Sequence, residues 1–299
     1  MAKERRSLSG KVVAITGGAR GIGRSTAEAL VRKGCRVALG DLDLDLAERT
    51  AAELGGGTIA VRLDVTDRES FAAFLDEAER QLGPLDVLVN NAGIMPVTRF
   101  AEESDDSIRR QLDINVYGVV AGTQLALERM RPRRGGHIVN LASSAGKAGV
   151  PGIATYSGTK HFVVGFTEAV RAECREEGID LSYVMPITVN TQLIEGLQDY
   201  PGVKRVEPED VANEIVGALE TGKVDVYVPR QLRASVVIGT LLPRRAREAV
   251  ARFMGVTKVM TEVSPEARRA YEERAAYSEP GEEPASSPAD AAPSQRDAA

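Results

Sequence analysis

Short apolar runs alternate with amphipathic stretches along the first three quarters of the chain. Val12–Thr16 is the first such run, uncharged and rich in β-branched residues, which is typical of a strand buried on both faces. The amphipathic stretches carry apolar residues at helical spacing, and several end at a glycine such as Gly34 or Gly83. The pattern predicts strands over residues 12–16, 36–41, 58–63, 85–89, 137–141, 179–185 and 224–228. It predicts helices over residues 24–34, 43–54, 67–82, 104–130, 154–177 and 208–220.

Strands that alternate with helices in this way predict an α/β fold, a doubly wound Rossmann-type parallel sheet with helices on both faces. We expect residues 1–230 to form this single domain and residues 231–277 to form a C-terminal helical extension. Residues 278–299 are rich in Pro, Ala, Ser and acidic residues, so this tail is predicted to be disordered. Ligands of such sheets bind beyond the carboxyl ends of the strands. Polar residues follow several of the predicted strand ends: Arg20, Asp41, Asp64, Asn90 and Ser143.

Composition narrows the function classes. The 299 residues are 43% hydrophobic, which is enough for a large core, and the net charge of −5 argues against a nucleic-acid partner. Only two cysteines, Cys35 and Cys174, and two histidines occur, so we expect reduced thiols and no metal site. The N-terminal residues have no apolar signal sequence, and no run of apolar residues is long enough to span a membrane. These features predict a cytoplasmic protein.

Tyr156 and Lys160 form the first candidate for chemistry. Lys160 comes four residues after Tyr156 in a predicted helix, so the two side chains share one helix face. A neighbouring ammonium favours the phenolate, and we expect it to lower the pKa of Tyr156 enough for general acid/base catalysis. Ser143 follows the predicted strand over residues 137–141, where its hydroxyl can hold a substrate oxygen while Tyr156 transfers the proton. A Tyr-x-x-x-Lys spacing on its own also fits an ordinary helix surface.

A glycine-rich turn follows the first predicted strand and opens the next helix. Its spacing, Gly17-x-x-x-Gly21-x-Gly23, lets the backbone approach a pyrophosphate that rests on the helix N-terminus. The turn predicts a dinucleotide contact by Gly17, Ala19, Arg20, Gly21, Ile22 and Gly23. Asp41, at the end of the second strand, can accept both ribose hydroxyls and would repel a 2′-phosphate, whereas Arg20 could pair with that phosphate. We therefore expect NAD as the preferred cofactor, with NADP possible.

With these motifs, the chain resembles the classical short-chain dehydrogenase/reductase family over roughly residues 8–228. The glycine turn matches the family's TGxxxGxG motif, and Asn90-Asn91-Ala92-Gly93 matches its NNAG turn. The resemblance implies that Asp64 and Val65 hold the adenine and that Asn91, Ala92 and Gly93 lie beside the cofactor. It implies that Val189 and Thr191 contact the carboxamide and the phosphates. The implied catalytic residues are Ser143, Tyr156, Lys160 and Asn115, and the last of these passes the proton to water.

The family reaction is hydride transfer between nicotinamide and an alcohol or ketone. The resemblance thus implies an NAD(P)-dependent alcohol dehydrogenase or carbonyl reductase that works as a homodimer or homotetramer. The alternative is a catalytically silent dinucleotide sensor or scaffold on the same fold, although the complete catalytic set argues against it. One departure is Ile187, which stands where the family has glycine and cannot adopt a positive φ cheaply.

The C-terminal third of the chain is the expected source of substrate specificity. The apolar residues Leu193, Ile194 and Leu197 predict a lid over the substrate. Residues 232–255 combine an apolar run with several arginines, which fits a helix packed over the site, a subunit contact or peripheral contact with a membrane surface. If this helix shields the site, a lipophilic alcohol is the expected substrate.

Overall fold

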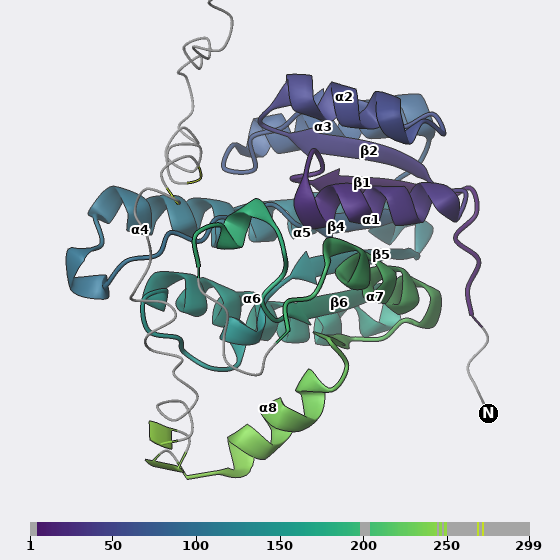
Figure 1. Ribbon diagram of the computed structural model, residues 1–299. Coiled ribbons are helices and arrows are strands. Elements are labelled where there is room, and N and C mark those ends of the chain that lie inside the picture. The colour runs from purple at the N-terminus through teal and green to yellow at the C-terminus, as the bar shows by residue number, and fades with distance from the viewer. Residues whose placement is uncertain are drawn as a thin grey trace, which may run out of the picture.

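A seven-stranded parallel sheet forms the centre of the protein, in the strand order β3-β2-β1-β4-β5-β6-β7 (Figure 1). The computed structural model describes residues 5–197, 204–243, 245–246, 248–249, 268 and 271. The strands are β1 (Val12–Thr16), β2 (Arg36–Asp41), β3 (Ile59–Arg62), β4 (Val87–Asn90), β5 (Gly136–Leu141), β6 (Ile179–Pro186) and β7 (Asp225–Val228). The predicted doubly wound parallel sheet is confirmed.

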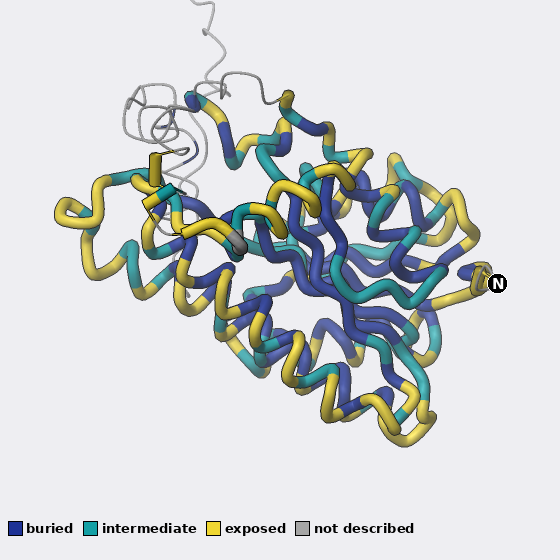
Figure 2. The backbone as a smooth tube through the Cα atoms, turned by 90° about the horizontal axis from the view of Figure 1, so that it is seen from below, coloured by how far each residue is buried: buried dark blue, intermediate teal, exposed yellow. Residues whose placement is uncertain are grey.

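Helices cover both faces of this sheet. They are α1 (Gly21–Arg32), α2 (Leu44–Leu54), α3 (Arg68–Leu82), α4 (Asp105–Leu112), α5 (Gly118–Met130), α6 (Ala154–Glu173), α7 (Pro208–Thr221) and α8 (Leu232–Leu241). Successive residues of β1 point to opposite faces: Val13 and Ile15 join the apolar cluster of α1, α2 and α7, while Val12 and Ala14 join that of α3 and α5. Every residue of β1 is buried, and Figure 2 shows the buried strands inside a shell of helices with exposed outer faces.

The strand order reverses between β1 and β4, which are neighbours although two strands and three helices separate them in the sequence. The connections from β1 run toward one edge of the sheet and those from β4 toward the other. Because the connections leave in opposite directions, a crevice forms at the carboxyl ends of these two strands. This is the usual ligand position in such sheets.

The predicted helix over residues 104–130 contains a π-helical turn. The backbone runs on from α4 through the π turn Asp113–Tyr117 into α5, and Ser104 caps its start by accepting from the N–H of Ser107. A π turn places an extra residue in the helix and occurs frequently at functional sites. A hydrophobic pattern does not reveal this change of winding.

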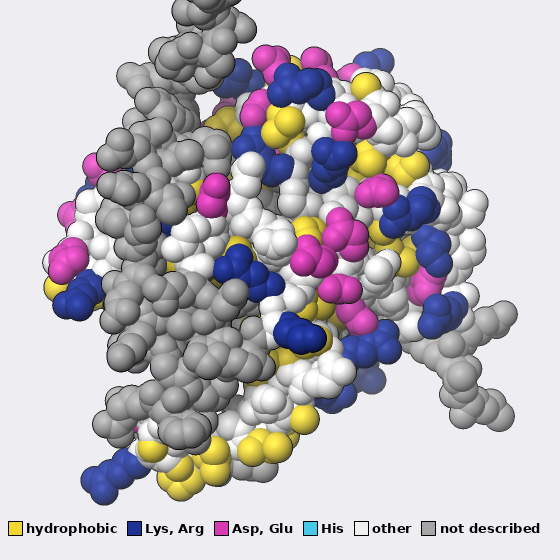
Figure 3. All heavy atoms as spheres, in the orientation of Figure 1, with side chains coloured by type: hydrophobic (Ala, Val, Ile, Leu, Met, Phe, Trp, Pro, Cys, Tyr) yellow, Lys and Arg dark blue, Asp and Glu magenta, His cyan; other side chains and the backbone are white. Residues whose placement is uncertain are grey.

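Helix α8 begins the C-terminal extension. Leu232 and Val236 pack against the apolar cluster that β6 and α6 share, whereas Val237, Ile238 and Leu242 are exposed. Figure 3 shows hydrophobic side chains gathered over this end of the molecule. The helix ends at Leu241, because Leu242 precedes Pro243 and has an extended backbone.

The end of the segment 232–255, from residue 250 on, lies outside the described residues, as do the predicted disordered tail and part of the predicted lid. The boundaries of the extension at residues 231 and 277 stay predictions. Within the part of the chain that the structure describes, no helix is both long and apolar enough to cross a membrane.

Candidate active site

Tyr156 lies in the first turn of α6, beside the carboxyl end of β5. Its side chain is buried, and so is that of Lys160 one turn later, whose Nζ lies 5.5 Å from the centre of the Tyr156 ring. Ser143 follows β5 and caps a short 3₁₀ turn, with Oγ accepting from the N–H of Ala145 at 3.2 Å. The structure therefore brings the predicted Ser143, Tyr156 and Lys160 together.

Burial shifts the pKa values of Tyr156 and Lys160. It raises the pKa of Tyr156 above its ordinary value, and a hydrogen bond with Ser143 acts in the opposite direction but is the smaller effect. Burial also lowers the pKa of Lys160 to about 8. The predicted lowering of the Tyr156 pKa is wrong for this arrangement, because burial of the phenol is the largest effect on it. The Lys160 ammonium donates to the carbonyl of Leu141 at 2.8 Å. A raised pKa favours the protonated phenol, which can donate a proton.

Asn115 lies in the π turn and is completely buried. Its Oδ1 accepts from the N–H of Ile94 at 2.9 Å, and its Nδ2 donates to the carbonyl of the same residue at 2.9 Å and to Thr159 Oγ1 at 3.3 Å. A side chain at Gly93 would place its Cβ 3.1 Å from Asn115 Oδ1 and 3.6 Å from Lys160 Nζ. The loop after β4 therefore passes directly over Lys160, and Asn115 holds it in place.

The glycine turn between β1 and α1 has the properties of an anion site. Arg20 is the N-cap residue of α1 but its side chain caps no N–H group, and the first turn of α1 has no acidic residue. The helix dipole and the free N–H groups at this end favour a phosphate. Gly17 and Gly21 have φ values of +63° and +51°, and a Cβ at Gly23 would lie 2.1 Å from the carbonyl oxygen of Gly17. These residues fit the pyrophosphate of a dinucleotide.

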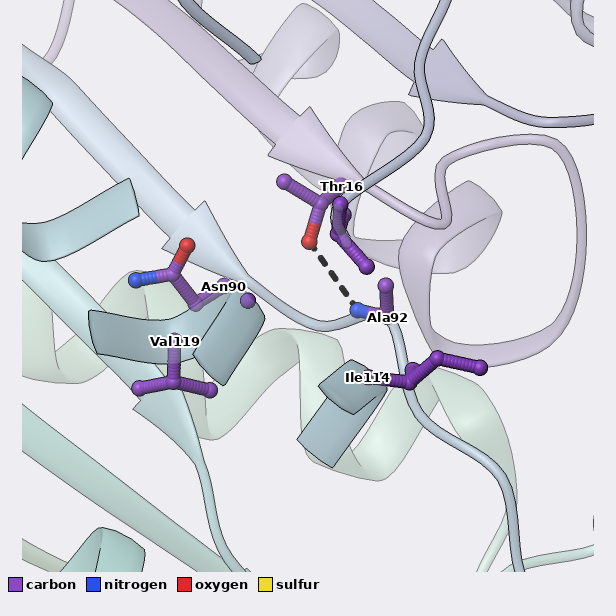
Figure 4. Close-up of a pocket in the computed structure, with 7 residues that line it drawn as sticks. Thr16, Asn90, Ala92, Ile114 and Val119 are labelled. Atoms are coloured by element: carbon purple, nitrogen blue, oxygen red, sulfur yellow. Dashed lines mark hydrogen bonds between the residues drawn. The ribbon is translucent and has the colours of Figure 1, made fainter. Parts of the chain in front are cut away.

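Thr16, at the end of β1, joins the glycine turn to the loop after β4. Its Oγ1 accepts from the N–H groups of Asn91 and Ala92, both at 3.0 Å, as Figure 4 shows for Ala92. Asn91 Nδ2 donates in return to the carbonyls of Thr16 and Gly17 at 2.9 Å. Thr16 is the threonine of the TGxxxGxG motif, but the sequence analysis assigned it no role. The available signal was a polar residue at the end of an apolar strand.

A small pocket opens between these strand ends and the π turn. It is lined by Thr16, Val65, Asn90, Ala92, Ile114, Gly118 and Val119 (Figure 4). The side chain of Asn90 donates to Asn140 Oδ1 at 2.8 Å, while its own buried oxygen has no hydrogen-bond partner among the described residues. The predicted residues Val65 and Ala92 thus line one cavity at the topological switch point, beneath the glycine turn.

Asp41 ends β2 opposite the glycine turn. Its carboxylate accepts from the N–H of Ala19 at 3.0 Å and from that of Asp43 at 3.2 Å, and burial raises its pKa. The guanidinium of Arg20 pairs with the carboxylate of Asp43 at 2.5 Å. Asp64 is turned toward its own loop, where it accepts from the N–H of Thr66 at 2.8 Å.

The loop after β6 reaches the other side of the glycine turn. A Cβ at Gly21 would lie 3.3 Å from the Thr191 methyl group, so these two predicted residues are neighbours, and Val189 is buried nearby in the loop. Ile187 packs against the core and donates its N–H to the carbonyl of Val228 at 2.9 Å. Its φ is not positive, and the loop accommodates it without the strain that the missing glycine suggested.

An apolar cluster surrounds the Tyr156 ring. Its buried members are Met95, Ala145, Ile153, Tyr156, Ile194 and Leu197, and the partly buried Val97, Val150 and Leu193 pack against it. The sequence analysis identified Tyr156, Leu193, Ile194 and Leu197 but missed the others, which come from segments that carry no periodic pattern. Hydroxyl, phenol and ammonium groups thus meet against an apolar wall.

Residues 11–201 match the short chain dehydrogenase family, and the chain belongs to that family. Sorbitol dehydrogenase of Cereibacter sphaeroides is 38% identical over 205 residues, which span 67% of this chain and 80% of that protein. Rat (Rattus norvegicus) 17-beta-hydroxysteroid dehydrogenase 13 is 29% identical over 263 residues, which span 85% of this chain and 86% of that protein. Glycine betaine reductase ATRR of Emericella nidulans is 36% identical over 224 residues, 71% of this chain but only 18% of that longer protein.

A solved structure has the same fold. It is a short chain dehydrogenase/reductase from Burkholderia phymatum in complex with NAD, with a TM-score of 0.72 and 27% sequence identity, and the match covers 77% of this chain and 93% of that one. Family and fold together make this chain an oxidoreductase that acts on alcohols or carbonyl compounds with a nicotinamide cofactor.

Proposed function

We propose that this protein interconverts an apolar alcohol and its ketone or aldehyde with NAD, and that Tyr156 transfers the proton. The observation that carries the proposal is the meeting of three buried groups, Ser143, Tyr156 and Lys160, against an apolar wall at the carboxyl end of β5. A buried phenol beside a buried ammonium is costly for the fold and is typical of a catalytic site.

The chain's own residues divide the work of the reaction. Bound NAD supplies the hydride chemistry, and the glycine turn with the N-terminus of α1 would hold its pyrophosphate. Ser143 holds the substrate oxygen, and Tyr156 gives that oxygen the phenolic proton during reduction or takes it back during oxidation. Lys160 keeps a positive charge behind the phenol, and Asn115 fixes the loop that passes over Lys160.

Two contacts support NAD rather than NADP. The Asp41 carboxylate lies at the end of β2, where a ribose carries its 2′ group, and a phosphate there would meet a negative charge. Arg20, the residue that could offset this repulsion, is already paired with Asp43.

The apolar wall supports a substrate without charged groups. The relatives' names span a wide range, from a sorbitol dehydrogenase to a 17-beta-hydroxysteroid dehydrogenase, so they do not choose between polar and apolar alcohols. In this chain the apolar cluster around Tyr156 consists of Met, Ala, Ile, Leu and Val side chains, which offer a polyol no hydrogen bonds. Burying apolar surface is their only means of binding a substrate.

The test is an NAD⁺ reduction assay with sorbitol, cyclohexanol, 2-octanol and a 17-hydroxysteroid. We expect turnover of the apolar alcohols and none of sorbitol. Tyr156→Phe should lower the rate by about 10²–10⁴-fold because the general acid/base is lost. NADH binding, measured by its fluorescence, should stay unchanged, and the exposed Tyr117 gives the matched control Tyr117→Phe. Turnover by Tyr156→Phe, or oxidation of sorbitol alone, would overturn the proposal.

We further propose a homodimer or homotetramer. Leu112, Tyr117 and Phe162 are exposed on the neighbouring elements α4, the π turn and α6, and Phe162 stacks on Phe166. Light scattering after gel filtration tests this assembly, and a monomer at micromolar concentration would exclude it. The cytoplasmic location stays a prediction.

A further inference from the structure

Two residues of the C-terminal extension, Arg268 and Tyr271, are buried in the candidate active site. Arg268 is 1% exposed and donates from Nη2 to the carbonyl of Met95 at 2.8 Å. Its Nη1 donates to the carbonyls of Leu193 and Glu195, each at 3.2 Å. One guanidinium thus joins the loop after β4 to the loop after β6, which border the site from opposite sides.

Only arginine suits this position. Its planar guanidinium presents five N–H groups in a fixed fork, so it can satisfy several carbonyls at once, whereas lysine offers a single flexible ammonium. A buried cation is costly unless it is hydrogen-bonded, and a buried carbonyl without a donor is costly as well. The guanidinium and the three loop carbonyls therefore stabilise one another.

Tyr271 holds the same loop through the backbone N–H of Met95, whereas Arg268 holds it through the carbonyl. Its hydroxyl accepts from the N–H of Met95 at 2.8 Å, and the Arg268 guanidinium lies 4.7 Å above its ring. The ring is 8% exposed and belongs to the apolar cluster that contains Ile94 and Ile114. It lies near enough to Tyr156 to contribute to the raised pKa of that phenol.

Met95 is the link to the substrate. Its N–H is held by Tyr271, its carbonyl by Arg268, and its side chain packs in the same cluster as Tyr156. Leu193, whose carbonyl Arg268 also holds, packs against that cluster. Any movement of Arg268 or Tyr271 therefore shifts the wall that a substrate beside Tyr156 would touch.

We propose that Arg268 and Tyr271 complete the substrate site from the C-terminal extension and determine how long an apolar alcohol the site accepts. Arg268 is a positioning residue that fixes both loops, and Tyr271 is the wall against which the far end of the substrate stops. The inference rests on the proposed function, because it assumes that an alcohol is oxidised beside Tyr156.

The test compares NAD⁺ reduction with 2-alkanols from 2-butanol to 2-dodecanol. In the intact protein, each added methylene that becomes buried should raise kcat/KM by about fourfold until the chain meets Tyr271. Tyr271→Ala should move the optimum to longer alkanols and lower kcat/KM for the short ones. Tyr271→Phe keeps the ring and should retain the original optimum. Arg268→Met should raise KM for every alkanol with a smaller effect on kcat.

The matched control is Arg175→Ala. Arg175 is exposed and follows α6, whose 20 residues place it about 30 Å along the helix from Tyr156. All variants should bind NADH as the intact protein does, which shows that they are folded. The same chain-length optimum in the intact protein and in Tyr271→Ala, or an unchanged KM in Arg268→Met, would overturn the inference. Absence of turnover with every alkanol in the intact protein would instead count against the proposed function.

A second measurement needs no turnover. The chain has no tryptophan, so Tyr271→Trp introduces a single fluorescent reporter at the proposed wall. NAD⁺ and 2-octanone are both oxidised and cannot react, and their joint addition should shift the emission of this tryptophan. The exposed Tyr117 gives the comparison variant Tyr117→Trp, which should not respond. An unchanged emission from Tyr271→Trp, under conditions where 2-octanone inhibits alcohol oxidation, would place Tyr271 away from the substrate.

Discussion

Replacing Asn115 with alanine tests whether one side chain holds the loop after β4. Asn115 is completely buried, and its amide makes a pair of hydrogen bonds with the backbone of Ile94, both at 2.9 Å. Alanine is well tolerated in a helix, so the substitution removes these contacts and leaves the local backbone preference intact.

The structure sets the size of the effect. Ile94 is 9% exposed, so its N–H and carbonyl would lose their partner and remain largely cut off from water. Each buried group left without a hydrogen-bond partner lowers the free energy of unfolding by about 1–3 kcal/mol, and the two groups together lower it by about 2–6 kcal/mol. In a large domain, each kcal/mol of lost stability lowers Tm by about 2–4 °C. We therefore expect Asn115→Ala to melt at least about 4 °C below the intact protein.

The assay is thermal unfolding followed by far-UV circular dichroism, with turnover measured well below both melting temperatures. Asn213 is exposed on α7, and Asn213→Ala controls for the loss of an asparagine from a helix. Equal melting temperatures for the two variants would refute the clamp. If Asn115→Ala also lost turnover without losing stability, the water relay that the family resemblance implies would be the better explanation of Asn115.

Three further predictions concern the cofactor and the proton. Gly23→Ala should weaken NADH binding by more than about tenfold, because the added Cβ would lie 2.1 Å from the Gly17 carbonyl oxygen. Fluorescence titration with NADH measures this, and Gly217→Ala, where the Cβ meets open space, is the control. Asp41→Ser should raise the kcat/KM ratio of NADP⁺ to NAD⁺ by at least about tenfold by removing the charge, and an unchanged ratio would contradict our NAD assignment. Because burial raises the pKa of Tyr156, the phenol is protonated throughout the neutral range. Ketone reduction should therefore be flat from about pH 6 to 8, while alcohol oxidation should rise with pH; an oxidation rate independent of pH would show that another group takes the proton.

The sheet was predictable because its strands are buried on both faces. A strand such as β1, covered by helices on either side, is apolar throughout, and its five residues coincide with the predicted range. The polar residues after the strand ends were also predictable as neighbours, because parallel strands bring their carboxyl ends to one edge of the sheet. Arg20, Asp41 and Ser143 lie at this edge for that reason.

The protonation of the site was not predictable from spacing. A four-residue separation correctly places Tyr156 and Lys160 on one helix face, but it does not state how deeply the face is buried or which acceptor the ammonium finds. Desolvation is the largest effect on the Tyr156 pKa here, and the Lys160 ammonium donates to the Leu141 carbonyl. Arg268 and Tyr271 were missed for a related reason, because only tertiary packing brings an arginine and a tyrosine from the C-terminal extension to the backbone of Met95.

The loop after β4 explains how these distant elements act on one site. Thr16 at the end of β1 holds the backbone at Asn91 and Ala92, and Asn115 in the π turn holds Ile94. The C-terminal extension holds both backbone atoms of Met95. Four of the five successive residues 91–95 are thus held by three separate parts of the chain, with the glycine turn at one end of the loop and the apolar wall at the other. Hydride transfer requires a precise distance between cofactor and substrate, and a loop fixed in this way sets that distance independently of either ligand.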